Sequence, residues 1–530
     1  MDMDMNTIME MATMNKKTNN IPFFLALFPF IVLISTLLIN VFIYPDEIIG
    51  GSKIALIFSA AIACIIGIIY KIQWEVIING ISNSIKSVSP AIILILMIGA
   101  LSGTWLISGI IPSMIYYGLE LLNPKIFLVA TCIICSIVSL STGSSWGTAA
   151  TVGLALLGIG NTLGFNNGIT AGAIISGSYF GDKLSPLSDT TNLAPAVSQT
   201  SLFKHIRYMT YTTIPSYLIS LIIFTIIGLN NSLEKINGNV EQMMNIIETS
   251  FNLTPILFIV PIIVIILIIK KTPAIPSLFI GTLLGALFFA IFQGKIQQKE
   301  KMSDNYIEII NAISVETKLT TTNNEIKDLD IIEYTEKKEK FKIKYTDILV
   351  KNLEGDLILD VHHPAFLKAK EKKGLFQSKG MYGMMDTIWL LICAMIFGGT
   401  IQATGILRIV SQPLLKSATN NLTLVTSTAG TCIFFNIASS DQYLSIIIPG
   451  KMFKDNYEKQ KLDLVNLSRT LEDSGTVTSV LIPWNSCGAY HQGILGISTL
   501  TYLPYCFFNL ISPLMTILYA YFQIKIKKIK

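Results

Sequence analysis

The sequence predicts an all-α membrane protein that crosses the bilayer many times. Of its 530 residues, 51% are hydrophobic and only 14% are charged, and the mean hydropathy is +0.59. That is more apolar surface than a soluble core of this length needs. Apolar runs also recur with lengths that approach or reach the roughly 17 to 25 residues that span a hydrocarbon core of about 30 Å.

These runs predict about nine membrane spans. They cover residues 21–44, 54–70, 91–111, 126–140, 209–229, 255–269, 276–292, 388–406 and 501–522. The first run is longer than the apolar region of a signal peptide and no clear cleavage site follows it, so we expect it to be retained as a span.

The distribution of polar sequence divides the chain into five segments. We expect an N-terminal tail (1–20), a first membrane half (21–292), a hydrophilic extramembrane insert (293–380), a second membrane half (381–522) and a basic C-terminal tail (523–530). Alternating runs in the insert, such as 341–345 and 357–361, predict a few strands.

Lysines beside the spans predict the sidedness of the short segments. The lysine-rich C-terminal tail and the loop with Lys270 and Lys271 are expected in the cytoplasm, and the acidic loop at 45–47 and the 230–252 loop outside. The rule does not place the long insert, because long segments translocate largely regardless of charge.

Polar interruptions of the apolar sequence are the best indicators of function. The run Gly181-Asp-Lys-Leu-Ser-Pro-Leu-Ser-Asp-Thr-Thr-Asn192 places two carboxylates and a lysine between stretches that read as membrane-embedded. Ionisable groups inside a membrane cost roughly 2.5 to 3.5 kcal/mol each on insertion scales and are functional-site candidates by default.

The second half repeats this chemistry. The small and hydroxyl residues at 141–148 and the run at 181–192 find counterparts at 436–442 and at 471–486, roughly 290 to 295 positions later. Such paired interruptions predict a transporter site built from two inverted repeats with broken helices.

The proline residues explain why the chain should open there. Pro186 and Pro483 lack an amide hydrogen and disfavour a helical conformation of the preceding residue. Opened carbonyls, hydroxyls and carboxylates would form an oxygen-rich pocket that suits an alkali cation rather than a transition metal. Proton and cation would compete for the same oxygen atoms, and this competition alone produces antiport when the site changes sides only while occupied.

Four motifs carry a resemblance to a known family. Residues 141–153, Gly177-Ser-Tyr-Phe-Gly-Asp-Lys-Leu-Ser-Pro-Leu-Ser-Asp-Thr-Thr-Asn-Leu-Ala194, Ser440-Asp-Gln-Tyr-Leu-Ser445 and residues 471–488 are similar to the NhaC family of sodium/proton antiporters. The resemblance covers nearly the whole chain. It implies the ion-transporter superfamily architecture of re-entrant hairpins, broken helices, and scaffold and transport regions. It also implies a multi-pass protein of the cytoplasmic membrane that acts in pH homeostasis, and a homodimer.

Five acidic residues are the predicted cation- and proton-binding groups: Asp182, Asp189, Asp441, Glu472 and Asp473. We expect Na⁺ at this site, with Na⁺ and H⁺ as transported ions and no cofactor. The predicted polar shell consists of Ser144, Ser145, Thr148, Ser185, Ser188, Thr190, Thr191, Asn192, Ser439, Ser474, Thr476, Asn485 and Ser486. By the resemblance, 188–192 and Asn485-Ser486 correspond to the Ser-Asn-Thr-type tips of the superfamily.

Each of these residues also has a structural interpretation. Asp182 and Asp189 are suited to pairing with Lys183 or to capping helices. Glu472 and Asp473 are adjacent, so on a helix they point about 100° apart. We expect one of the two to bind the ion and the other to pair with Arg469 or Lys461. Ser144, Ser145 and Thr148 also permit close helix packing.

Other functions are weighed against sodium/proton exchange. A sodium- or proton-coupled exchanger of small carboxylates, of the malate/lactate type, shares the fold and would use cations such as Lys183 and Arg469. A cation channel is the remote alternative. We expect no enzymatic activity, because the Gly-x-Gly-Asp and Tyr-Asp motifs of intramembrane aspartyl proteases are missing from the sequence.

Overall fold

The structure is a computed structural model of the whole chain. It describes residues 21–42, 50–230, 244, 245, 247–270, 272–293, 302–315, 317–320, 331–336, 339–344, 349–351, 357–359, 374–378, 380–416 and 418–529. The predicted N-terminal tail, residues 1–20, lies outside these described residues, as do the remaining parts of the insert.

The chain is a polytopic helical membrane protein. The helices before the insert are α2 (Phe23–Phe42), α3 (Gly51–Ile69), α4 (Trp74–Ile107), α5 (Ile110–Leu121), α6 (Phe127–Thr142), α7 (Ser145–Thr148), α8 (Leu154–Thr162), α9 (Asn167–Leu184), α10 (Asp189–Val197), α11 (Leu202–Leu229), α13 (Ile259–Ile269) and α14 (Ala274–Phe288). Those after the insert are α18 (Met385–Ala403), α19 (Ile406–Lys416), α20 (Asn421–Ala438), α21 (Leu444–Lys459), α22 (Val465–Leu471), α23 (Ser486–Leu495), α24 (Thr499–Tyr502) and α25 (Phe507–Tyr521).

Seven helices among the described residues are long and apolar enough to span a membrane. They correspond to seven of the nine predicted runs. The run at 501–522 forms a pair of helices bent by 57°, which counts as an eighth span if the pair is one. The run at 255–269 is a correction: it forms an apolar helical stretch of fewer than 18 residues, too short to pass as a span.

The longest helix also corrects the prediction. Apolar sequence predicted a span at 91–111, but α4 is a single helix that begins at Trp74 and includes Pro90. Its first half is more polar than a free span would be. Helix α4 packs against both α18 and α14. This tertiary packing explains the extra length of the helix.

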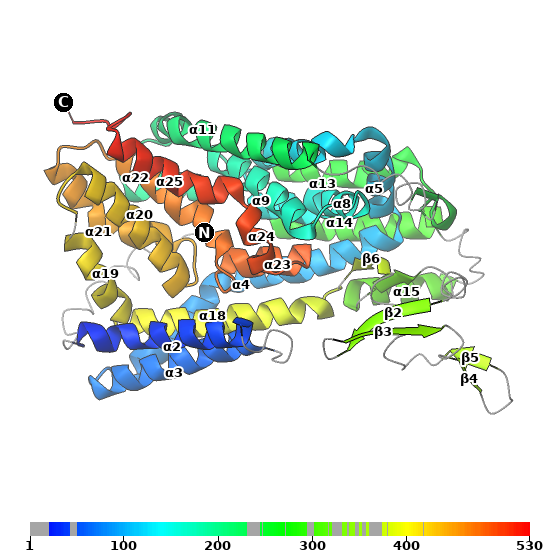
Figure 1. Cartoon of the computed structure of the whole chain (residues 1–530), viewed down its shortest axis with the longest axis horizontal. Helices are drawn as coiled ribbons and strands as arrows, with labels where there is room; N and C mark the ends of the chain where they lie inside the picture. Colours follow the sequence, from blue (N-terminus) through cyan, green and yellow to red (C-terminus); the bar gives the residue numbers. More distant parts are fainter. Residues whose placement is uncertain are drawn as a thin grey trace.

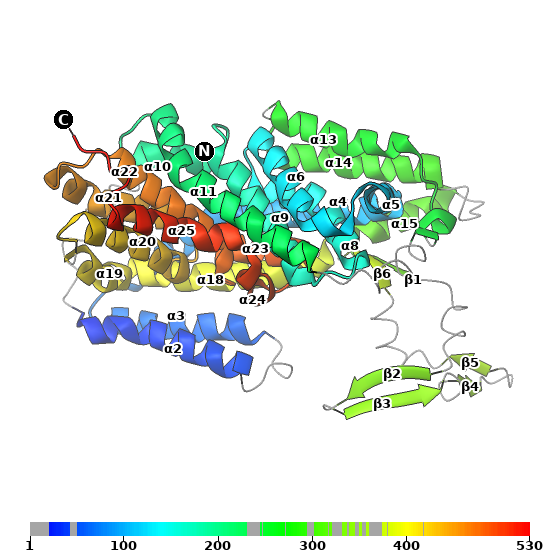
Figure 2. The same ribbon diagram turned by 45° about the horizontal axis from the view of Figure 1, so that its top comes forward.

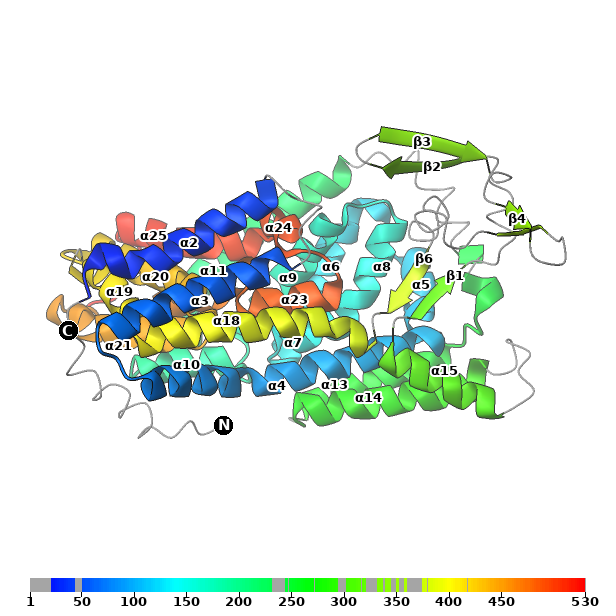
Figure 3. The same ribbon diagram turned by 90° about the horizontal axis from the view of Figure 1, so that it is seen from below.

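The helices form an elongated bundle whose two ends differ. Helices α19, α21 and α22 and the C-terminus gather at one end, and strands β2 to β5 lie at the other (Figure 1). Helices α2 and α3 run along one side of the bundle (Figure 2) and contact each other and α18 or α19. Helix α23 lies in the middle of the molecule, against α18 and α4 (Figure 3).

The insert contains the predicted strands and an additional helix. Its strands are β1 (Thr317–Thr320), β2 (Ile331–Glu336), β3 (Glu339–Lys344), β4 (Leu349–Lys351), β5 (Leu357–Leu359) and β6 (Gly374–Ser378). They form two-stranded antiparallel pairs, β1 with β6, β2 with β3 and β4 with β5. Strands are therefore confirmed at 341–344 and 357–359, the described parts of the two predicted runs, while helix α15 (Met302–Ser314) was not predicted.

Helices α6 and α9 pack unusually closely through glycine. A Cβ atom built on Gly177 would lie 2.1 Å from the carbonyl oxygen of Cys132, and one on Gly181 would lie 2.3 Å from that of Ser136. Small residues permit such backbone approach in membranes, where the gain comes from van der Waals contact rather than from hydrophobic burial. This approach positions the C-terminal end of α9, which carries Asp182.

We therefore expect Gly177→Ala to destabilise the protein. The added methyl group would force α6 and α9 apart, at a cost of about 1–3 kcal/mol. Gly430→Ala on α20 is the matched control, because a Cβ atom there meets nothing within 4 Å and alanine favours helix by up to about 1 kcal/mol. Thermal unfolding in detergent should show a lower midpoint for Gly177→Ala alone. Equal midpoints for both variants would contradict the close packing.

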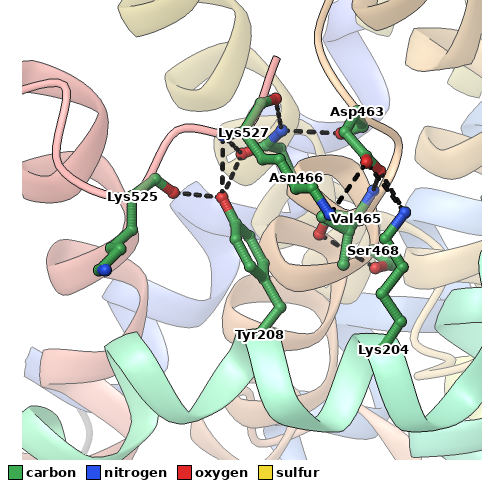
Figure 4. Close-up of polar contacts among 8 residues, drawn as sticks. All are labelled: Lys204, Tyr208, Asp463, Val465, Asn466, Ser468, Lys525 and Lys527. Carbon is green, nitrogen blue, oxygen red and sulfur yellow. Dashed lines mark hydrogen bonds and ion pairs between the residues drawn. The ribbon is translucent and has the colours of Figure 1, made fainter. Parts of the chain in front are cut away.

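The C-terminal tail is hydrogen-bonded to residues at the N-terminal end of α22. The amide of Asp463 donates to the carbonyl oxygen of Lys527 at 2.9 Å, and the Asn466 side chain both donates to that carbonyl and accepts from the Lys527 amide. The hydroxyl of Tyr208 donates to Asn466 Oδ1 and to the carbonyl oxygen of Lys525 (Figure 4). This arrangement links α11, the tail and α22.

Asp463 is the acidic centre of this arrangement. Its carboxylate accepts from Lys204 Nζ at 2.9 Å and lies 3.5 Å from Lys527 Nζ. Burial raises the pKa of the Asp463 carboxyl, but hydrogen bonds from Lys204 and the Val465 amide, with the charges of Lys204 and Lys527, lower it by more. The pKa in the folded protein is therefore below its ordinary value.

This lowered pKa predicts a pH-dependent contribution to stability. The contribution is complete above the pKa of the carboxyl in the unfolded chain, about 3.9, and is lost as the pH falls through the lower folded pKa. Asp463→Asn should therefore lower the unfolding midpoint at neutral pH and make little difference below the folded pKa. Asp455→Asn, at an exposed carboxylate of α21, is the control and should match the wild type at both pH values. If Asp463→Asn lowered the unfolding midpoint equally at both pH values, the ionised carboxylate would not be the source of the stability.

Candidate functional site

Four helix breaks carry nearly all of the predicted site residues. They lie between α6 and α7, between α9 and α10, between α20 and α21, and between α22 and α23. Hydrogen bonds connect breaks from the first half of the chain to breaks from the second half, so residues 282 and 290 positions apart meet in one buried group.

The first break follows a left-handed glycine. Helix α6 ends at Thr142, and the next residue, Gly143, has a φ of +67°, a conformation that favours glycine. Ser144 then caps α7, with its Oγ accepting from the amide of Gly147 at 3.0 Å. The hydroxyl of Thr148 donates back to the carbonyl oxygen of Ser144. After α7 the chain forms a π-helical segment, Ala149–Gly153.

The second break opens where Pro186 predicted it. Helix α9 ends at Leu184, Ser185 is extended, and Ser188 caps α10 with its Oγ accepting from the amide of Thr191. The hydroxyl of Thr191 donates to the carbonyl oxygen of Lys183 at 3.0 Å. The break thus turns the end of α9 back against α10, with Asp182 and Lys183 in the last turn of α9.

The third break, between α20 and α21, contains Asp441. Ser440 has a φ of +59°, a left-handed conformation uncommon for serine, and its hydroxyl has no hydrogen-bond partner among the described residues. The Asp441 carboxylate accepts from the amide of Leu444 at 2.9 Å. Asp441 therefore caps the start of α21 while lying buried, 5% exposed.

The fourth break follows a π-helical segment, Glu472–Thr476, that continues α22. The chain passes Pro483, and Asn485 caps α23 by accepting from the amide of Cys487 at 3.1 Å. The Asn485 side-chain amide also donates to the backbone carbonyl oxygen of Asn436. The side-chain amide of Asn436 in turn donates to the backbone carbonyl oxygen of Gly475 at 2.7 Å. The third and fourth breaks are held together by these side-chain amides.

Two of the predicted carboxylates meet hydroxyl groups from another break. Ser145 Oγ donates to Asp182 Oδ2 at 2.8 Å, and Thr190 Oγ1 donates to Glu472 Oε1 at 3.1 Å. The second contact joins the first half of the chain to the second. Asp182 is 8% exposed and Glu472 is completely buried.

A third carboxylate is engaged by a basic residue. Asp473 forms an ion pair with Lys183, and both side chains are completely buried. Thr212 Oγ1 of α11 donates to Asp473 Oδ2 at 2.8 Å, and Lys183 Nζ also donates to Ser512 Oγ of α25 at 3.0 Å. We expected either Glu472 or Asp473 to pair with Arg469 or Lys461. One of the two does form an ion pair, but the basic partner of Asp473 is Lys183.

Several oxygen atoms of the fourth break lack hydrogen-bond partners within the described residues. They are Glu472 Oε2, Ser474 Oγ and Thr476 Oγ1, all on the π-helical segment and all in completely buried residues. No three acidic, histidine or cysteine side chains gather as a metal site in the part of the chain that the structure describes. A cation here would thus be held mainly by hydroxyl and carbonyl oxygens, together with one or two carboxylates.

Two predicted residues are exposed rather than buried. Asp189, in the first turn of α10, is exposed, so its role as an ion ligand stays a prediction. Asn192 is also exposed and donates to the carbonyl oxygens of Pro186 and Ser188, which stabilises the bend. The remaining shell residues Ser185, Ser188, Thr190, Thr191, Ser439 and Ser486 are buried beside the breaks.

Sequence reasoning missed the aromatic contact between the halves. The rings of Trp146 on α7 and Tyr490 on α23 stack with centroids 3.9 Å apart, and the Tyr490 hydroxyl donates to the carbonyl oxygen of Trp146 at 3.1 Å. It also missed Thr212 and Ser512 as partners of the ion pair. Their only signal was hydroxyl residues within otherwise apolar spans, a pattern that helix packing also produces.

Comparison with known proteins gives consistent results. The model of the Na+/H+ antiporter family matches residues 177–329 and 348–524. The Na(+)/H(+) antiporter NhaC of Alkalihalophilus pseudofirmus is 32% identical over 94% of this chain and 95% of its own. The Malate-2H(+)/Na(+)-lactate antiporter of Bacillus subtilis is 35% identical over 88% and 89%. The arginine/ornithine antiporter ArcD of Halobacterium salinarum is 32% identical over 84% and 82%.

The buried ion pair predicts a specific pattern of stabilities. Asp473→Leu or Lys183→Met should each destabilise the protein by about 3–5 kcal/mol, because each leaves one charge buried without its partner. The double variant Lys183→Met/Asp473→Leu should recover most of that loss. Unfolding in mixed micelles measures all three.

The pair between Lys53 and Asp386, 2.5 Å apart, provides the control. The Asp386 side chain is 64% exposed, and Lys53, itself 7% exposed, also lies over the Trp389 ring at 4.8 Å, so Asp386→Asn should cost less than either single variant of the fully buried pair. Additive losses in the Lys183/Asp473 double variant would mean that the two charges do not depend on each other.

Proposed function

The chain belongs to the Na⁺/H⁺ antiporter family and is a multi-pass protein of the cell membrane. On that premise we propose that it exchanges Na⁺ for H⁺ across this membrane. The exchange proceeds by alternating access around the four helix breaks. The family consists of transporters rather than enzymes by the names of its curated members.

One observation carries this proposal. Two buried carboxylates from different halves, Asp182 and Glu472, face hydroxyl groups across the breaks, and Glu472 Oε2 has no partner among the described residues. Carboxylate, hydroxyl and carbonyl oxygens are hard ligands, which suit a cation such as Na⁺. Without such a cation, burial disfavours the charged form of a carboxylate and so favours its protonation.

The exchange follows from this competition. A sodium ion at the breaks favours the ionised carboxylates, and its departure favours protonation, because a buried unpaired anion is costly. If the site changes sides only with one or the other bound, sodium moves one way and protons the other. Asp473 has a different role in this scheme: its charge is already balanced by Lys183, so it holds the site together.

The proposal includes the architecture that the sequence predicted. The halves 21–292 and 381–522 form two inverted repeats with re-entrant hairpins, separated by the insert 293–380 and followed by the tail 523–530. The pairing of breaks supports this, since each half contributes two. A homodimer formed through outer helices completes the proposal, and mass measurement of the purified protein in detergent tests it.

Exchange of small carboxylates is the second candidate function. One similar relative is named as a malate/lactate antiporter, and buried Arg469 has two side-chain nitrogens, Nε and Nη2, without partners among the described residues. Against it, Lys183 is occupied by Asp473 and Ser512. The third nitrogen of Arg469 donates to the Lys525 carbonyl in the tail, which directs this side chain away from the breaks.

Transport by the purified protein in liposomes distinguishes the two functions. With a pH-sensitive dye inside, addition of Na⁺ alone should move protons and change the fluorescence. Addition of malate or lactate should change neither the rate nor the extent. A strict requirement for an organic acid would reject sodium/proton exchange in favour of the second candidate.

Substitution of the two facing carboxylates should abolish the signal. Asp182→Asn and Glu472→Gln each remove a group that must be charged with Na⁺ and neutral with H⁺, and both preserve size. Asp189→Asn should raise the KM for Na⁺ with kcat retained, because that carboxylate is exposed at the edge of the site. Asp455→Asn is the control and should behave as the wild type. Wild-type exchange by both Asp182→Asn and Glu472→Gln would overturn the proposed ligands and point to Asp441.

A further inference from the structure

A basic pocket lies where the C-terminal tail meets the start of α11. Its volume is about 690 Å³. Four basic residues line it together with two tyrosines: Lys204, Arg207, Lys525, Lys527, Tyr208 and Tyr211. Its lining contains none of the residues of the four helix breaks.

The pocket carries uncompensated positive charge. Asp463 is the acidic residue that contacts its lining, and it is shared by Lys204 and Lys527. Arg207 and Lys525 have no acidic partner among the described residues. Lys525 Nζ instead lies 4.7 Å from the centroid of the Tyr211 ring. Two cations therefore stay available to an anion, and a pocket of this kind suits a phosphate group.

An apolar stripe leads from the pocket along α11. Arg207, Tyr211, Ile214, Leu218 and Ile222 follow one another at intervals of three or four residues, so they share one face of the helix. The apolar members are well exposed, with Ile214 at 45%, Leu218 at 53% and Ile222 at 59%. Because α11 is one of the candidate spans, this face contacts lipid chains rather than water.

We propose that this pocket binds the headgroup of an anionic phospholipid, with Arg207 and Lys525 on the phosphate and the acyl chains along the exposed stripe of α11. The continuity of pocket and stripe favours a lipid over a free phosphate ion, which has no use for the apolar face. Tyr211, 39% exposed in the lining of the pocket, fits the aromatic belt at the membrane interface. Basic pockets beside membrane helices recognise such headgroups.

Bound lipid would stabilise the attachment of the tail to α22. Lys525 supplies both a cation of the pocket and the carbonyl oxygen that accepts from Arg469 Nη1 at 3.2 Å. Arg469 lies one turn before Glu472 on α22 and its π-helical continuation. The headgroup site thus contacts the same segment as the breaks, whichever solute the protein exchanges.

The test is lipid binding to the purified full chain in neutral detergent, measured by native mass spectrometry. Phosphatidylglycerol should bind more tightly than phosphatidylcholine. Arg207→Gln/Lys525→Gln should weaken phosphatidylglycerol binding about thirtyfold, and each single variant about fivefold, because each basic residue near an anionic surface contributes about 1 kcal/mol and about 1.4 kcal/mol is tenfold in affinity. The single variants keep the comparison available if the double variant does not fold.

A matched control removes two charges elsewhere at the same end. Lys451 and Lys459 of α21 are exposed and do not line the pocket, so Lys451→Gln/Lys459→Gln should leave affinity within about twofold. Equal losses in the two double variants would overturn the pocket in favour of general attraction. Inorganic phosphate should not displace phosphatidylglycerol at matched concentration, and full displacement would overturn the choice of a lipid.

Discussion

The ion pair between Lys183 and Asp473 is the constraint on which the site depends. Both side chains are completely buried, and each charge would be very costly there without the other. Hydroxyl groups of Thr212 and Ser512 complete their hydrogen bonding. The pair and its partners thus bring together α9, α11, α25 and the π-helical segment after α22. Because the charges cancel, the neighbouring Asp182 and Glu472 do not have to neutralise a fixed cation, and their own charge is free to vary.

Irregular backbone is the second feature of the site. Each break exposes amides and carbonyls that a regular helix would satisfy, which membranes tolerate only inside protein. Here serine, threonine and asparagine side chains satisfy most of them, as Ser144, Ser188 and Asn485 do by capping the next helix. The same side chains place oxygen atoms beside the carboxylates. Structural capping and ion binding are therefore served by the same residue types, which explains why the two interpretations are hard to separate from sequence.

The sequence was most informative where a local cause determines local structure. Pro186 and Pro483 located two breaks, and apolar length located most spans, although it missed the short helix at 255–269, the early start of α4 and the bend within 501–522. Alternation predicted strands in the insert. Partners far apart in the chain were not predictable, because nothing local to Asp473 indicates Lys183. Asp182 and Asp189 belong to one motif, yet the bend between α9 and α10 buries the first and exposes the second. That difference depends on tertiary packing rather than on residue type.

The stack of Trp146 on Tyr490 limits how the two halves can move. Sliding α7 past α23 by one helical turn, about 5.4 Å, would separate rings whose centroids are 3.9 Å apart and would break the hydrogen bond to the Trp146 carbonyl. Shear at that junction is therefore disfavoured. In the exchange proposed above, the paired breaks would then rotate together as one rigid body against peripheral helices such as α2 and α3.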